Sequence, residues 1–197
     1  MNIDFSNPVV IGVICLVALV FVLAVVWVVA RQRNRKRTEE LRARFGPEYE
    51  LALRQYGSRG KAEAALMDRV ERVNRLSIHP LSEPDREHYL ADWEAIQARF
   101  IDHPRGAVTE ADELINTILR ARGYEGGDFD RRVADMSVHH ATLVEPYRRA
   151  NAVTVRAARN EATTEELRSA MILYRALIEE LLQANAPAAV TRRDVAA

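Results

Sequence analysis

The sequence predicts an all-α protein in which an N-terminal transmembrane helix is followed by a compact helical bundle. Three observations lead to this fold class. A long uncharged segment lies near the N-terminus, apolar residues then recur at three- and four-residue spacing, and no alternating strand pattern recurs after residue 30. The length of 197 residues suits one domain with an appendage.

The first element is the apolar segment from Val9 to Ala30. Its 22 residues carry no charge, and 16 of them are Val, Ile, Leu or Phe. As a helix the segment would be about 33 Å long, which is enough to cross the hydrocarbon core of a bilayer. A lone segment in lipid must satisfy its own backbone hydrogen bonds, so we expect a helix despite the many valines.

A cleaved signal peptide is the main alternative for this segment. It would carry basic residues before a shorter apolar run and end at a small-residue cleavage site. Here Asp4 precedes the run, the positive charges follow it, and Val28-Val29-Ala30 is a poor cleavage site. A membrane anchor is therefore the better interpretation.

A cluster of basic residues after the anchor predicts its orientation. By the positive-inside rule these residues stay in the cytoplasm, so residues 1–8 lie outside and the C-terminal domain is cytoplasmic at the inner (plasma) membrane. The same side chains are our candidates for contact with the membrane surface, although a topology signal alone is the commoner role of such a cluster. They are Arg31, Arg33, Arg35, Lys36 and Arg37.

Charge and cysteine content exclude several function classes. The chain has 28 basic and 28 acidic residues, but residues 38–197 carry 23 basic and 27 acidic side chains. This acidic balance disfavours a nucleic-acid partner, because phosphate binding needs a clustered positive surface. The single cysteine, Cys15, excludes an intramolecular disulfide and any zinc site with two or more cysteines.

The next three helices follow from their stop signals. Helix is expected to continue from Arg31 to about Phe45 and to end at Gly46-Pro47. A short helix from Pro47 to Gln55 or Tyr56 follows, since proline suits a first helical position. A third helix is expected over 60–76.

Capping residues predict the remaining helices. Ser82 is expected to cap a helix that carries Tyr89, Trp93, Ile96 and Phe100 on one face. Further helices are expected over 104–122, before a left-handed Gly123, and over 129–136, after Asp128. Two capping boxes come last: Thr142 with Glu145, and Thr163 with Glu166. The helix after the second box has an apolar stripe made of Leu167, Ala170, Met171, Tyr174, Leu177, Ile178 and Leu181.

This pattern divides the chain into five parts. After an extracytoplasmic N-terminus come the anchor, a basic juxtamembrane linker, a bundle whose helices bury their stripes against each other, and a flexible tail. Their ranges are 1–8, 9–30, 31–58, 59–183 and 184–197.

No recognised catalytic motif occurs, and no cofactor is expected. His88 with Asp92 and Asp135 with His139 are each spaced four apart, which would supply half of a metal site. No complete ligand motif accompanies them, so we expect no metal, cofactor or catalytic residue.

Several short stretches together resemble an uncharacterised family of bacterial proteins, often labelled hypothetical or secreted. They include Phe45-Gly-Pro-Glu-Tyr49, Tyr89 through Trp93 to Phe100, and Thr164-Glu-Glu-Leu-Arg168. The resemblance covers residues 31–183 and implies one membrane helix with a helical cytoplasmic part. It implies no catalytic residue.

The expected function is that of a membrane-anchored cytoplasmic protein-interaction or scaffolding module. Its partners are expected to be the lipid bilayer and a protein not identified by the sequence. The alternative is a membrane-tethered enzyme or metal-binding helical protein that uses the two His/Asp pairs.

Overall fold

The computed structural model describes residues 8–124 and 127–183, without the side chains of residues 8–15, 17, 18 and 34. Within these ranges the chain forms eight α-helices and no strand, which confirms the all-α fold class. The helices are α1 (Pro8–Phe45), α2 (Pro47–Tyr56), α3 (Arg59–Val73), α4 (Glu83–Arg99), α5 (Pro104–Ala121), α6 (Phe129–Met136), α7 (Ala141–Ala158) and α8 (Thr164–Gln183). The expected tail over 184–197 and residues 1–7 of the expected N-terminus lie outside the described residues.

The chain divides into two compact units within α1. The first holds α1 up to Leu41, and the second begins at Arg42 and holds the end of α1 with α2 to α8. In the first unit the described side chains of residues 16 to 30 are all exposed. Trp27, for example, is 61% exposed. This stretch therefore presents apolar surface on every side.

No helix in the described part of the chain is both long enough and apolar enough to cross a membrane. The segment predicted over 9–30 is confirmed as helical. The structure does not show its insertion in a bilayer, which stays a prediction.

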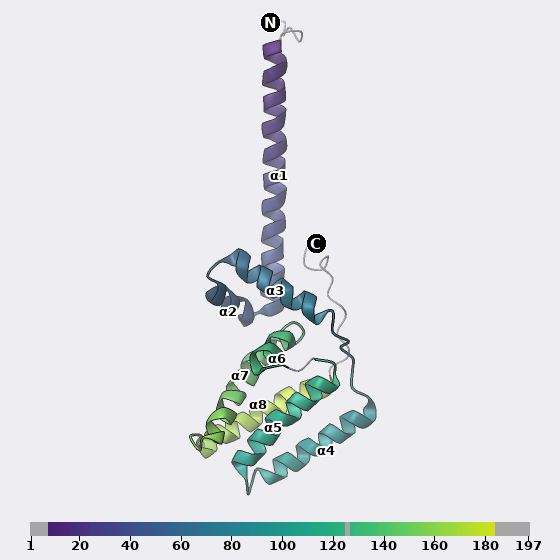
Figure 1. Ribbon diagram of the computed structural model, residues 1–197, viewed down its shortest axis with the longest axis vertical. Helices are drawn as coiled ribbons and strands as arrows, with labels where there is room; N and C mark the ends of the chain where they lie inside the picture. The colour runs from purple at the N-terminus through teal and green to yellow at the C-terminus, as the bar shows by residue number, and fades with distance from the viewer. Residues whose placement is uncertain (1–7, 125–126, 184–197) are drawn as a thin grey trace. The chain divides into compact units, whose positions relative to one another are not determined.

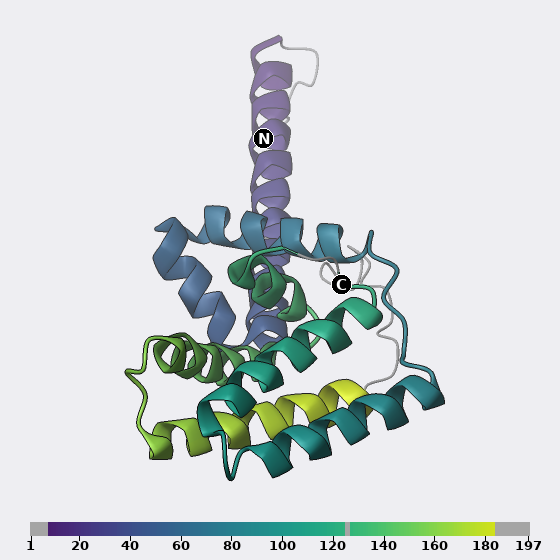
Figure 2. The ribbon, with the colours of Figure 1, turned by 60° about the horizontal axis from the view of Figure 1, so that its bottom comes forward.

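Three helices of the second unit enclose its main core. α5, α7 and α8 pack against one another, and α4 lies along α5 (Figure 1 and Figure 2). All seven residues of the predicted stripe on α8 are buried. Trp93 and Ile96 of α4 are also buried, whereas Tyr89 and Phe100 are only partly covered. The second unit is therefore a helical bundle, as predicted.

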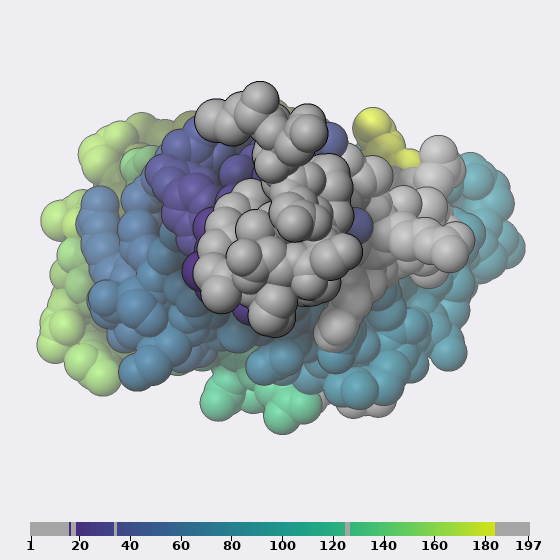
Figure 3. All heavy atoms as spheres, turned by 90° about the horizontal axis from the view of Figure 1, so that it is seen from above, coloured from purple at the N-terminus to yellow at the C-terminus, as the bar shows by residue number. Residues whose placement is uncertain are grey.

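Charged residues connect α2 and α3 to the rest of the second unit. Glu48 of α2 is 3% exposed and accepts hydrogen bonds from the Arg148 guanidinium of α7 at 2.6 and 3.3 Å. Arg72 of α3 donates two bonds, of 2.9 and 2.7 Å, to the buried Asp135 carboxylate of α6. Side chains of α2 and α3, in blue, and of α4, in teal, are exposed on the face shown in Figure 3.

The predicted start of α7 is wrong. His140, and not Thr142, occupies the N-cap position, and the helix begins at Ala141. A turn in which the His140 N–H bonds the Met136 carbonyl at 2.9 Å brings the chain into the helix early. As a result Pro146 lies inside the helix, where it cannot donate the backbone bond that the Thr142 carbonyl would accept.

The other predicted helix ends and N-caps agree better with the structure. α3 ends at Val73, before the expected residue 76, because the N–H groups of Arg75 and Leu76 turn back to the carbonyls of Arg72 and Val73. Ser82 and Asp128 cap α4 and α6 as predicted. The Thr163–Glu166 capping box is formed in both directions, with distances of 2.8 and 3.3 Å.

Candidate interaction groove

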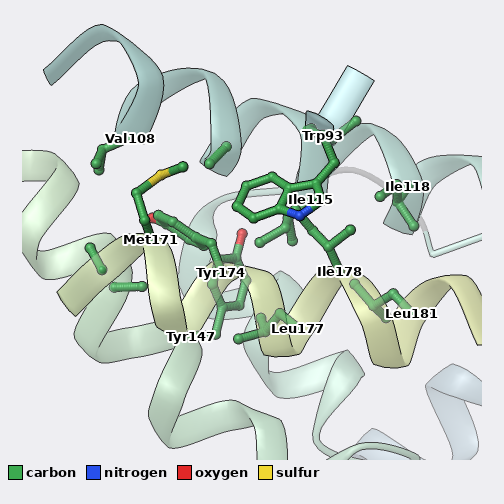
Figure 4. Close-up of a cluster of buried hydrophobic side chains, with 14 of the residues drawn as sticks. Trp93, Val108, Ile115, Ile118, Tyr147, Met171, Tyr174, Leu177, Ile178 and Leu181 are labelled. Carbon is green, nitrogen blue, oxygen red and sulfur yellow. The ribbon is translucent and has the colours of Figure 1, made fainter. Parts of the chain in front are cut away.

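A shallow groove runs between α4 and α8 on the second unit. It encloses about 240 Å³ and is lined by Trp93, Gln97, Phe100, Arg168, Met171, Ile172 and Arg175. The groove exists because α4 packs mainly on α5 and meets α8 only over a short stretch. Figure 4 shows Trp93 and Met171 together with the core side chains of α5, α7 and α8.

The floor of the groove is apolar and continuous with the core. Trp93 is 3% exposed and Met171 is 8% exposed, so most of each side chain belongs to the packed core. Ile172 lies one residue after Met171 on α8, which turns its side chain away from the core, and it is 63% exposed. Ile172 therefore adds exposed apolar surface at the side of the buried tryptophan.

Two arginines flank this apolar floor. Arg175 donates to the Gln97 side chain of α4 at 3.2 Å, which bridges the two helices. Arg168 pairs with Glu165 at 2.6 Å, one turn earlier on α8. Among the described residues that line the groove there are two cations and no carboxylate. Arg175 also pairs with Glu179 of α8 at 3.5 Å. The lining is therefore suited to apolar side chains accompanied by acidic ones, which would compete with Glu165 and Glu179 for the two arginines.

The four predicted ligand residues do not form one ligand set in the described part of the chain. His88 and Asp92 form an exposed pair on α4 with a distance of 3.5 Å from Nε2 to the carboxylate. The Asp135 carboxylate accepts hydrogen bonds from the Arg72 guanidinium. In the described part of the chain, no group of three His, Cys, Asp or Glu residues is arranged to hold a metal ion.

His139 belongs instead to a partly buried cluster. Its Nδ1 lies 3.2 Å from the Tyr124 hydroxyl. Burial, followed by the nearby Arg44, His140 and Arg122, lowers the pKa of His139 to about 4. Burial also raises the pKa of Tyr124 to about 12. Both groups are therefore neutral near pH 7, which suits a structural hydrogen bond.

The sequence did not reveal a polar network inside the bundle. The Asp112 carboxylate accepts from the Tyr174 hydroxyl at 3.0 Å and from the Asn151 amide at 3.2 Å. The Tyr174 hydroxyl also lies 2.7 Å from that of Thr154. Burial and Asp112 raise the pKa of Tyr174. The only available signal was a tyrosine in the apolar stripe of α8, and its partners are 20 to 62 residues away.

The predicted membrane-surface residues lie on α1. Arg31, Arg33, Arg35 and Lys36 are exposed and Arg37 is half-buried. The Arg31 guanidinium lies 5.1 Å from the centre of the Trp27 ring, within the range of a cation–π contact. Their role at a membrane stays a prediction.

Comparisons with protein-family models, with curated proteins and with solved structures found no match. The resemblance to an uncharacterised bacterial family therefore stays a prediction.

Proposed function

We propose that this protein is a single-pass membrane protein whose cytoplasmic helical domain binds a partner protein in the groove between α4 and α8. The groove is the observation that carries the proposal. It combines a buried aromatic floor, an exposed aliphatic side chain and two arginines, and tryptophan and arginine are enriched among the residues that contribute most to interface binding.

The occupant that fits this groove is an amphipathic helix of the partner, with acidic residues beside its apolar face. Helix-in-groove recognition places side chains at positions i, i+3, i+4 and i+7 into a hydrophobic groove. Trp93, Met171 and Ile172 would receive those side chains. Arg168 and Arg175 would favour flanking carboxylates, because complementary charges guide association and orientation.

The membrane anchor in this proposal is the helix over 9–30. Its support is the 22-residue uncharged run, together with the exposure of every described side chain between residues 16 and 30. The arginine next to Trp27 would lie at the level of the lipid head groups, where an indole ring and a cation both find partners. A protein without such a bilayer contact would leave this apolar surface in water.

The orientation is tested with reporters fused after Ala197. A green fluorescent protein fusion should fluoresce and an alkaline phosphatase fusion should stay inactive, since the domain is proposed to lie in the cytoplasm. The opposite pair of results, or recovery of a chain cleaved near residue 30, would refute the anchored orientation.

The groove is tested by photo-cross-linking in intact membranes. A photo-reactive amino acid replaces Ile172, and the captured segments are sequenced by mass spectrometry. The proposal expects one recurring acidic amphipathic helix. A second set of cells carries the double change R168E and R175E, which should reduce capture at least tenfold by repelling the acidic residues.

The matched control places the same photo-reactive group at Val155 of α7, which is 45% exposed and does not line the groove. Capture of the same helix at Val155, or unchanged capture by the charge-reversed variant, would rule out the groove as its site. Capture of a second copy of this chain would replace the proposed partner with self-association.

A further inference from the structure

A second cavity lies in a different part of the bundle, beside α5 and the start of α6. It encloses about 420 Å³, which is within the usual range of small-molecule sites. Its lining is polar and consists of Glu113, Asn116, Thr117, Arg120, Gly127 and Arg132. The lining therefore contains two guanidinium groups and one carboxylate, and it carries net positive charge.

Arg132 is the more strongly fixed of the two arginines. Its Nη1 donates to the Gly127 carbonyl at 2.7 Å. Its Nε is buried and has no acceptor among the described residues. Because this Nε exposes no surface, a ligand in the cavity would have to use the Nη groups of Arg132.

Arg120 is held against the same wall of the cavity. Its Nε bonds the Asn116 carbonyl and its Nη2 bonds the Thr117 hydroxyl, each at 3.3 Å. A guanidinium has five donors in a fixed plane, so both arginines retain further N–H groups. Two such groups on one cavity form the usual recognition element for a carboxylate or a phosphate.

The rest of the wall is organised in advance. The Asn116 amide oxygen accepts from the Tyr147 hydroxyl at 2.9 Å, while its nitrogen donates to Asp112 at 3.4 Å. The Thr117 hydroxyl donates to the Glu113 carbonyl at 2.9 Å. These bonds connect the cavity wall to the polar network of the core, so little side-chain freedom would be lost on binding.

We propose that this cavity binds a small molecule through an oxyanion, either a carboxylate or a phosphate, held between Arg120 and Arg132. The Glu113 carboxylate in the lining repels anions of high charge, and it accepts a hydrogen bond from a hydroxyl or ammonium group of the same ligand. The ligand is thus a small, singly or doubly charged anion with a donor group.

The proposal is tested with the full chain in detergent micelles, by following the thermal midpoint and by calorimetric titration. The two probes are inorganic phosphate and succinate, each tested at constant ionic strength, with chloride as the reference anion. At least one probe should raise the midpoint, because a ligand that binds only the folded state stabilises it. The probe that binds more tightly distinguishes a phosphate ligand from a carboxylate ligand.

Three variants locate the binding. R132Q should weaken the binding of the preferred probe at least tenfold. R131Q changes a neighbouring arginine outside the lining and should bind the probe as the wild type does. E113Q changes an exposed side chain and should tighten binding about threefold, so it tests the site even if R132Q fails to fold. The proposal is wrong if neither probe binds, or if E113Q and R132Q both match the wild type.

Discussion

Among the described glycines, Gly123 has the least room for a side chain. Its φ is 91°, and a Cβ built there would lie 2.2 Å from the Ser77 carbonyl oxygen. The backbone next to Gly123 also forms a contact with this segment, because the His79 N–H donates to the Arg122 carbonyl at 3.0 Å. This glycine therefore closes α5 and allows the segment before α4 to approach it.

We expect Gly123→Ala to lower the free energy of unfolding by about 2–4 kcal/mol, because it combines backbone strain with a backbone clash. Urea unfolding followed by circular dichroism measures the change. Gly60→Ala is the matched control, since a Cβ at Gly60 in α3 would meet nothing within 4 Å. That change should be neutral or stabilise the helix by up to about 1 kcal/mol.

His139 is expected to make the stability of the protein depend on pH. Its pKa is about 4 in the folded state, below the ordinary 6.5, so the unfolded chain binds the proton first as the pH falls. Stability is therefore retained above about pH 6.5 and is lost progressively from there down to about pH 4.

Replacing His139 with Gln should make the loss of stability between pH 7 and pH 5 smaller than in the wild type. The free energy of unfolding in urea at the two pH values gives the difference. His88→Gln, which changes an exposed histidine, should leave the wild-type difference intact. A His139→Gln variant with the full wild-type loss would contradict this assignment.

A capping side chain determines where a helix starts only when the preceding turn does not start that helix earlier. Thr163 and Glu166 form the expected box before α8, and Arg156 also bonds Glu166. These bonds lower the pKa of Glu166 to about 2. Thr142 has the same sequence pattern but lies inside α7, because the preceding turn starts that helix first.

The two threonines should consequently differ in their contribution to stability. Thr163→Ala is expected to cost about 1 kcal/mol, since it removes an N-cap acceptor. Thr142→Ala should change the free energy of unfolding by less than about 0.5 kcal/mol. Equal losses in denaturant titrations of the two variants would mean that Thr142 is a cap after all.

The features of this fold that the sequence predicts are those that depend on residues close together in the chain. The caps at Ser82 and Asp128, the left-handed Gly123 and the stripe of α8 depend on near neighbours, so spacing reveals them. The groove and the cavity depend on pairs of helices distant in sequence. Nothing near Asp135 in the chain indicates that Arg72, 63 residues earlier, is its partner.

The division within α1 separates a unit whose described side chains between residues 16 and 30 are all exposed from a packed bundle. The second unit contains the main hydrophobic core, and the groove and the cavity both lie within it. Its helices bury their apolar faces against each other, which is the usual requirement for independent folding.

A fragment of residues 38–197 should therefore fold without the N-terminal segment. We expect a helical circular dichroism spectrum, a single cooperative thermal transition and a monomer by light scattering. A broad, non-cooperative transition would show that residues 1–37 are needed to complete the fold. The full chain in detergent provides the reference transition.

The two tryptophans of the chain fall one in each unit. Trp27 is 61% exposed on the first, and Trp93 is 3% exposed within the second. Their fluorescence therefore distinguishes binding in the groove from insertion of the first unit in a membrane. In a Trp27→Phe protein, the emission of Trp93 would report occupancy of the groove. In a Trp93→Phe protein, quenching of Trp27 by brominated lipids would report its depth in a vesicle.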